Sequence, residues 1–138
     1  MTKPNEYRAY FTVTGDFDPA EVTKLLGTNP TEAWQKGDRN ERTHFERKFS
    51  RWSLYSRLDS AVSLEEQVED VLDQLRPIAE RVISVRSQFE GWMQLVAFFY
   101  ESYPGLTFAP ATLLDLGRMK LAMDCDFYDL YSDRREDS

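Results

Sequence analysis

Apolar residues are densest along residues 91–101, Gly-Trp-Met-Gln-Leu-Val-Ala-Phe-Phe-Tyr-Glu, a stretch rich in β-branched and aromatic side chains. Turn signals bound it on both sides, so we interpret it as a long strand. Alternate residues of a strand face opposite ways, and here both sets are largely apolar. This pattern is typical of the interior of a sheet, so we expect other elements to flank and cover residues 91–101.

A strand and a short helix are predicted before it. Residues 7–14 alternate between apolar and polar side chains, which predicts a half-buried first strand. Asp18 is suited to be an N-cap, Pro19 to the first helical position, and Gly27 to the position just past the last turn. Together these three residues predict a helix between Pro19 and Leu26.

A hairpin is predicted next. Residues 33–36 form a brief strand pattern that ends at a Gly37-Asp38 turn, and residues 48–56 form a second one in which Trp52 and Leu54 share a face. The polar stretch between them, which includes Arg39–His44, predicts an irregular and mobile connection.

The longest helix is predicted from Ser63, which opens a Ser-Leu-Glu-Glu capping box. Apolar residues then recur at spacings of three and four as far as Phe89, which is helical spacing over about seven turns. Pro77 lies inside this stretch and either kinks the helix or starts a second segment, because its ring removes a backbone hydrogen bond. The alternation within Ile83–Phe89 leaves a strand as the alternative for those residues.

Pro110 opens a last helix, and the alternation of residues 121–128 predicts a final strand. The resulting order, β-α-β-β-α-β followed by α-β, predicts an α+β class with a ferredoxin-like two-layer arrangement, extended by a C-terminal αβ unit. We expect about five mostly antiparallel strands with the helices on one face, and the last strand beside residues 91–101. Residues 1–131 are predicted to form a single domain, and residues 132–138 a disordered acidic tail.

Composition narrows the class of protein. The 138 residues carry a formal charge of −7, which disfavours broad affinity for nucleic acids. No apolar run has the length of a membrane helix, and the first residues lack the apolar core of a signal peptide. A single cysteine, Cys125, fits a reducing compartment, so we expect a cytoplasmic protein with no membrane partner.

The charge is unevenly distributed along the chain. Residues 35–57 contain seven Lys or Arg and three acidic residues, a net charge of +4, so the remainder carries −11. A basic hairpin on an acidic body could steer an anionic partner, and an ordinary solvated loop is the alternative.

Several motifs taken in order resemble a bacterial family of domains of unknown function, number 4279. The residues that carry the resemblance are Gly15-x-Phe17-Asp18-Pro19, Leu25-Leu26-Gly27, Trp34, Gly37-Asp38, Trp52-Ser53-Leu54, Ser56, the capped helix from Ser63, Pro110, Leu113-Leu114 and Asp124-x-Asp126-x-Tyr128. The resemblance spans nearly the whole chain and implies a fold without an activity. It also suggests a toxin-neutralising role, which is suspected for some small domains of this kind.

Candidate chemistry is sparse. Asp124 and Asp126 lie two apart on the last predicted strand, hence on one face, where they could bind a divalent cation or divide acid and base roles. The alternative is that these acids only place charge on an exposed edge. His44, the single histidine, is interpreted as a surface residue, and Cys125 as a core residue because it alternates with the apolar set. No phosphate-binding or catalytic-triad motif is present, and we expect no cofactor and no catalysis.

The open face of the predicted sheet is the candidate partner-binding surface. Its candidate residues are Arg8, Tyr10, Trp92, Phe98, Tyr100 and Tyr128. Aromatic side chains beside charged ones are typical of protein interfaces. The sequence therefore predicts a non-catalytic interaction domain that binds a protein partner or forms a homodimer; a small enzyme or metal binder using Asp124 and Asp126 is the alternative. It also leaves open that the long helix or the Arg39–His44 loop covers this face as a second core.

Overall fold

The computed structural model describes residues 3–130, and the predicted tail at 132–138 lies outside them. Its elements follow in the order β1 (Glu6–Gly15), α1 (Pro19–Leu26), β2 (Glu32–Trp34), β3 (Ser50–Tyr55), α2 (Leu64–Leu75), the 3₁₀ turn η1 (Arg76–Ile78), α3 (Ala79–Gln88), β4 (Glu90–Phe99), α4 (Pro110–Arg118) and β5 (Ala122–Asp129).

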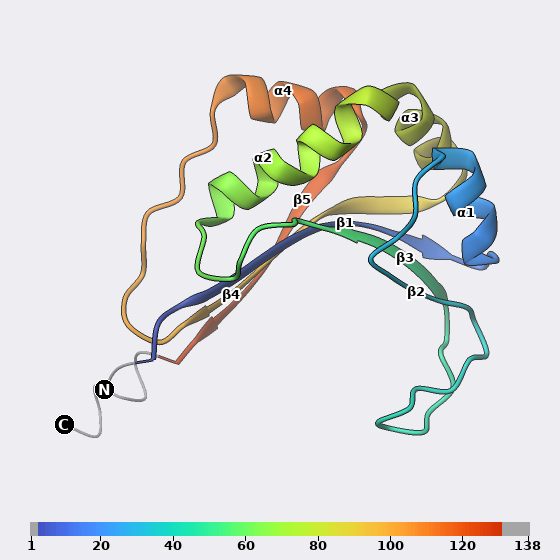
Figure 1. Ribbon diagram of the computed structural model, residues 1–138, viewed down its shortest axis with the longest axis horizontal. Helices are drawn as coiled ribbons and strands as arrows, with labels where there is room; N and C mark the ends of the chain where they lie inside the picture. Colours follow the sequence, from blue (N-terminus) through green and yellow to red (C-terminus); the bar gives the residue numbers. More distant parts are fainter. Residues whose placement is uncertain (1–2, 131–138) are drawn as a thin grey trace.

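The strands form one five-stranded sheet in the order β2-β3-β1-β4-β5. The neighbours β2–β3, β3–β1 and β1–β4 are antiparallel, whereas β5 pairs with β4 in parallel. The helices lie on one side of this sheet, as Figure 1 shows. The predicted α+β class, the mostly antiparallel sheet and the place of the last strand are therefore confirmed. The narrower ferredoxin-like assignment and the domain boundaries stay predictions.

The long helix is interrupted where the sequence places Pro77. Ser63 caps α2 by accepting a hydrogen bond from the Glu66 amide at 3.2 Å, and α2 ends at Leu75. The 3₁₀ turn η1 then contains Pro77, and α3 runs on to Gln88. Pro77 thus starts a second segment. The strand alternative for Ile83–Phe89 is wrong, because Val82 and Val85 pack into the core at helical spacing.

The core lies between the sheet and the helices. Phe11 and Trp52 from neighbouring strands meet edge to face with ring centroids 6.0 Å apart, and Val71 of α2 and Leu95 of β4 are also completely buried. The indole of Trp52 donates to Thr23 Oγ1 at 3.0 Å, which links β3 to α1. The predicted helix-facing residues of β4, Met93, Leu95, Ala97 and Phe99, are all buried.

A buried side chain joins α2 to β1 where β3 ends. The pairing of β3 with β1 stops at Tyr55, so the Ala9 amide finds no strand partner on that side. Gln67 of α2 takes its place: its Oε1 accepts from the Ala9 amide at 3.0 Å, and its Nε2 donates to the Tyr7 carbonyl at 2.8 Å. The same Nε2 also donates to the carbonyl of Val62 at 3.0 Å. Gln67 therefore continues the edge of β1 with side-chain hydrogen bonds.

The interpretation of Cys125 as a core residue is wrong, since its side chain is exposed. Cys125 pairs with Leu95 and faces the helix side, as its alternation predicts. The helix layer covers only the start of β5, however: Leu121 just before the strand is buried and Met123 is partly buried, whereas Phe127 further along is 42% exposed. Partial burial and the neighbouring Asp124 and Asp126 carboxylates raise the pKa of the Cys125 thiol, which makes it a poor nucleophile.

Candidate functional site

One face of the sheet points away from every helix of the described residues (Figure 1). The strand registers place on it Arg8, Tyr10 and Thr12 of β1; Arg51, Ser53 and Tyr55 of β3; Trp92, Gln94, Val96 and Phe98 of β4; and Asp124, Asp126 and Tyr128 of β5. We call this surface the open face. All six predicted partner-binding residues lie on it or, in the case of Tyr100, just past the end of β4.

The open face is not a second core. Tyr10, Trp92 and Phe98 are only half-buried, and Tyr128 is 49% exposed. The long helix lies on the opposite side of the sheet. The Arg39–His44 loop extends away from the sheet, beyond the ends of β2 and β3 that it connects (Figure 1). The alternative in which either of them buries this face is therefore wrong.

Aromatic rings on neighbouring strands stack in two places on the open face. Tyr10 and Tyr55 stack with ring centroids 4.3 Å apart and an interplanar angle of 23°. Phe98 and Tyr128 stack at 5.0 Å and 12°. Stacking fixes these rings in place, so the face offers rigid apolar anchors rather than mobile side chains.

Tyr55 was missed by the sequence analysis, which considered only the apolar alternation of β3. Because successive residues of a strand alternate, the same pattern that buries Leu54 places Tyr55 on the open face. Burial, together with the nearby Glu32 carboxylate, raises the pKa of Tyr55 to about 12. Burial likewise raises the pKa of Tyr10. Both hydroxyls therefore stay protonated, neutral groups at physiological pH.

Gln94 connects the aromatic and acidic parts of the open face. Its Oε1 accepts from the Trp92 indole at 2.8 Å, and its Nε2 donates to the Asp124 carbonyl at 3.1 Å and to Asp126 Oδ2 at 3.3 Å. Gln94 is itself buried among these neighbours. The central polar groups are thus already satisfied within the chain, which suits a binding face more than a reacting centre.

Asp124 and Asp126 share the open face, as predicted, but His44 does not join them. His44 lies on the β2–β3 connection at one edge of the sheet, and the two aspartates lie on β5 at the other. Residues 3–130 contain no group of three or more His, Cys, Asp or Glu side chains placed to hold a metal ion. A cation at β5 would find two carboxylates, one of them already accepting from Gln94, so the metal site stays a prediction.

The chain was compared with known proteins. A family model described as a domain of unknown function (DUF4279) matches residues 5–130. No curated protein and no solved structure matches the chain. Within the described residues, none of the helices combines the length and the apolar character that crossing a membrane requires.

Proposed function

The chain belongs to the DUF4279 family of domains of unknown function, and because membership supplies no activity, we propose a function from the geometry: a non-catalytic interaction domain that pairs with a second copy of itself through the open face. The uncovered aromatic stacks of that face carry the proposal. Monomeric proteins seldom expose apolar surface beyond a few hundred Å², so an occupant is expected there.

The arrangement of charge supports a second copy as the occupant. On the open face, Arg51 lies on β3 and Asp124 and Asp126 lie on β5, on either side of the β1–β4 pair. A two-fold axis that runs along the strands between β1 and β4 would place β3 of one copy opposite β5 of the other. The strand that carries Arg51 would then oppose the acidic strand of the other copy, which favours a self-complementary face.

A buried nitrogen of Arg51 supports the same arrangement. The Nε of Arg51 is buried yet has no hydrogen-bond partner among the described residues. A buried donor without an acceptor costs free energy, and small rearrangements in a complex could present it with a carboxylate. An opposing β5 carries such carboxylates.

A toxin-neutralising role is the alternative use of the same face. The same surface in a monomer would bind another protein, and the net charge of −7 suits a basic partner. The cytoplasmic location expected from the sequence and the bacterial origin implied by the family resemblance fit this role.

Light scattering coupled to size exclusion tests the pairing. We expect the wild-type chain to be a dimer and Phe98→Asp to be a folded monomer, because a carboxylate would be buried against the Tyr128 stack of the interface. Tyr128→Asp, on the exposed edge strand, repeats the test with less risk to folding. The matched control is Leu113→Asp, whose side chain is 54% exposed on α4, on the helix side.

The control should remain dimeric, and circular dichroism should show that all variants are folded. A monomeric wild-type chain, or dimers that persist in both open-face variants, would refute the pairing. Monomeric wild type that binds a basic partner protein only with Phe98 intact would instead assign the face to a different occupant.

A further inference from the structure

The connection between β2 and β3, residues 35–49, is hydrogen-bonded between its two arms. We call it the basic hairpin. The Gly37 amide donates to the Arg47 carbonyl at 2.9 Å, and the Arg47 amide donates to the Asp38 carbonyl at 2.7 Å. An isolated antiparallel β-bridge pairs the backbones of Arg39 and Glu46. Gly37 has a φ of 93°, a left-handed conformation that favours glycine and turns the chain here. The hairpin projects from the sheet on the side away from the helices (Figure 1).

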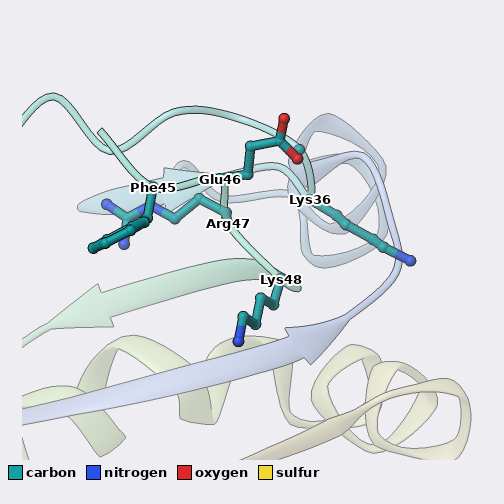
Figure 2. A pocket seen from close by; sticks show the side chains of 6 residues that line it. Lys36, Phe45, Glu46, Arg47 and Lys48 are labelled. Atoms are coloured by element: carbon teal, nitrogen blue, oxygen red, sulfur yellow. The ribbon is translucent and has the colours of Figure 1, made fainter. Parts of the chain in front are cut away.

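A hollow of about 720 Å³ lies on this hairpin, lined by Lys36, Gly37, Phe45, Glu46, Arg47 and Lys48. Phe45 is 77% exposed, the most exposed large apolar side chain of the described residues. Figure 2 shows the side chains of Phe45 and Arg47 extending to the same side of the hairpin, while Lys36 points the other way. The ring of Phe45 and the guanidinium group of Arg47 thus lie on the same side of the hairpin.

Arg47 is held in position by an aromatic platform. Its guanidinium lies 3.7 Å from the ring centroid of Trp34, and the Trp34 indole donates to the Phe49 carbonyl at 3.1 Å. A cation that is already ordered loses less conformational entropy when it binds an anion. Trp34 thus keeps Arg47 available on the hairpin surface.

The cations of the hairpin are largely without acidic partners. Arg42, Arg47 and Lys48 form no ion pair with any residue between 3 and 130, whereas Lys36 contacts only the exposed Asp16, at 3.5 Å. Residues 35–49 have a net charge of +2 on a chain of −7. The hairpin therefore carries an excess of positive charge on an otherwise acidic protein.

We propose that the basic hairpin binds an acidic protein segment that carries an aromatic or aliphatic side chain. Carboxylates of the segment pair with Arg42, Arg47 and Lys48, and its apolar side chain packs against Phe45 in the hollow. A short acidic segment contacts only the hairpin. A nucleic acid strand extends further and meets the acidic body, which repels its phosphates. This site adjoins the β2–β3 edge of the open face, where Trp34 pairs with Arg51, and it is far from the Phe98–Tyr128 stack at the other edge.

Fluorescence anisotropy measures the binding directly. The probe is a labelled peptide of glutamates with one central phenylalanine, at about 50 mM salt, where exposed charges are weakly screened. We expect binding that weakens as salt is raised. Peptides with glutamine in place of glutamate should bind more weakly because they lose the charged contacts. Peptides with alanine in place of phenylalanine should bind more weakly because they lose the apolar contact with Phe45.

The variant Arg42→Glu/Lys48→Glu should weaken peptide binding about tenfold or more, since two attractive contacts become repulsive. The matched control, Lys24→Glu/Arg118→Glu, makes the same change in net charge at the ends of α1 and α4 and should bind as wild type does. Phe98→Asp, on β4, should also leave binding unchanged, which distinguishes the hairpin site from the proposed pairing through Phe98 and Tyr128.

Three outcomes would overturn the proposal. One is a labelled peptide that does not bind the wild-type protein. Another is equal loss of affinity in the hairpin variant and the charge-matched control. The third is tighter binding of a thymidine oligonucleotide of the same length, which would assign the hairpin to nucleic acid instead.

Discussion

At the scale of single residues, the Tyr10–Tyr55 stack shows how the open face combines apolar and polar character. The two rings lie 4.3 Å apart, so each shields the other from water. Their hydroxyl groups lie near the carboxylate of Glu32, which disfavours a second negative charge. The pair is therefore apolar toward a partner and resists ionisation.

This predicts a loss of stability at alkaline pH that depends on Tyr55. The pKa of Tyr55 is about 12 in the folded chain against an ordinary value of 10.0, so the unfolded residue loses its proton first. The resulting stabilisation is fully present below pH 10 and disappears as the pH rises through about 12. In Tyr55→Phe the free energy of unfolding, measured by urea denaturation across this range, should fall less steeply than in wild type. An unchanged pH profile in Tyr55→Phe would contradict the assignment.

At the scale of elements, Gln67 shows how a helix completes a sheet. Its side chain is almost completely buried, and its hydrogen bonds reach Tyr7, Ala9 and the segment before α2. Helix α2 thus packs on β1 by apolar contact and also supplies hydrogen bonds where β3 no longer does.

Replacing Gln67 by leucine should therefore destabilise the chain by about 2–4 kcal/mol, because the Ala9 amide and Tyr7 carbonyl would be left buried without partners. Chemical denaturation measures this difference in the free energy of unfolding. Gln88→Leu, on the exposed end of α3, is the matched control and should change the free energy of unfolding little. Equal effects of the two substitutions would show that the Gln67 hydrogen bonds contribute nothing specific.

The elements also show which features the sequence could predict. The caps at Asp18 and Ser63 and the break at Pro77 are local, because each follows from the chemistry of a few neighbouring residues. The exposure of Cys125 is not local, because it depends on how far a helix layer from another part of the chain reaches over β5. The open face was predicted from β4, whereas the contribution of Tyr55 required the register of β3 against β1.

At the scale of the whole molecule, one arginine links the α4–β5 unit to the helix layer. Arg76, in η1, donates to Asp115 of α4 at 2.9 Å and to Glu69 of α2 at 2.9 Å. A hydrogen bond from Thr112 of α4 and the Arg76 guanidinium lower the pKa of Glu69. Through these contacts the helix layer holds the unit that places β5 beside β4.

Substituting Arg76 by methionine should loosen this unit selectively, because Glu69 and Asp115 would then repel each other without a cation between them. Hydrogen–deuterium exchange should become faster in α4 and β5 and stay unchanged in β1 and β3. Arg81→Met, whose guanidinium donates to the Leu26 carbonyl at 3.5 Å and lies away from α4, is the control. Faster exchange throughout the chain would mean that Arg76 stabilises the whole fold.

The central position of β1 has a consequence for the timing of synthesis. Thr12 of β1 pairs with Ser53 on one side and with Trp92 on the other, so the strand that is made earliest waits longest for both its neighbours. At roughly 5–20 residues per second, this wait lasts on the order of ten seconds on a ribosome. Until β4 is made, the apolar residues Phe11 and Val13 have at most one strand neighbour, β3, and an incomplete core. The nascent chain therefore offers a hydrophobic segment to chaperones until β4 has emerged.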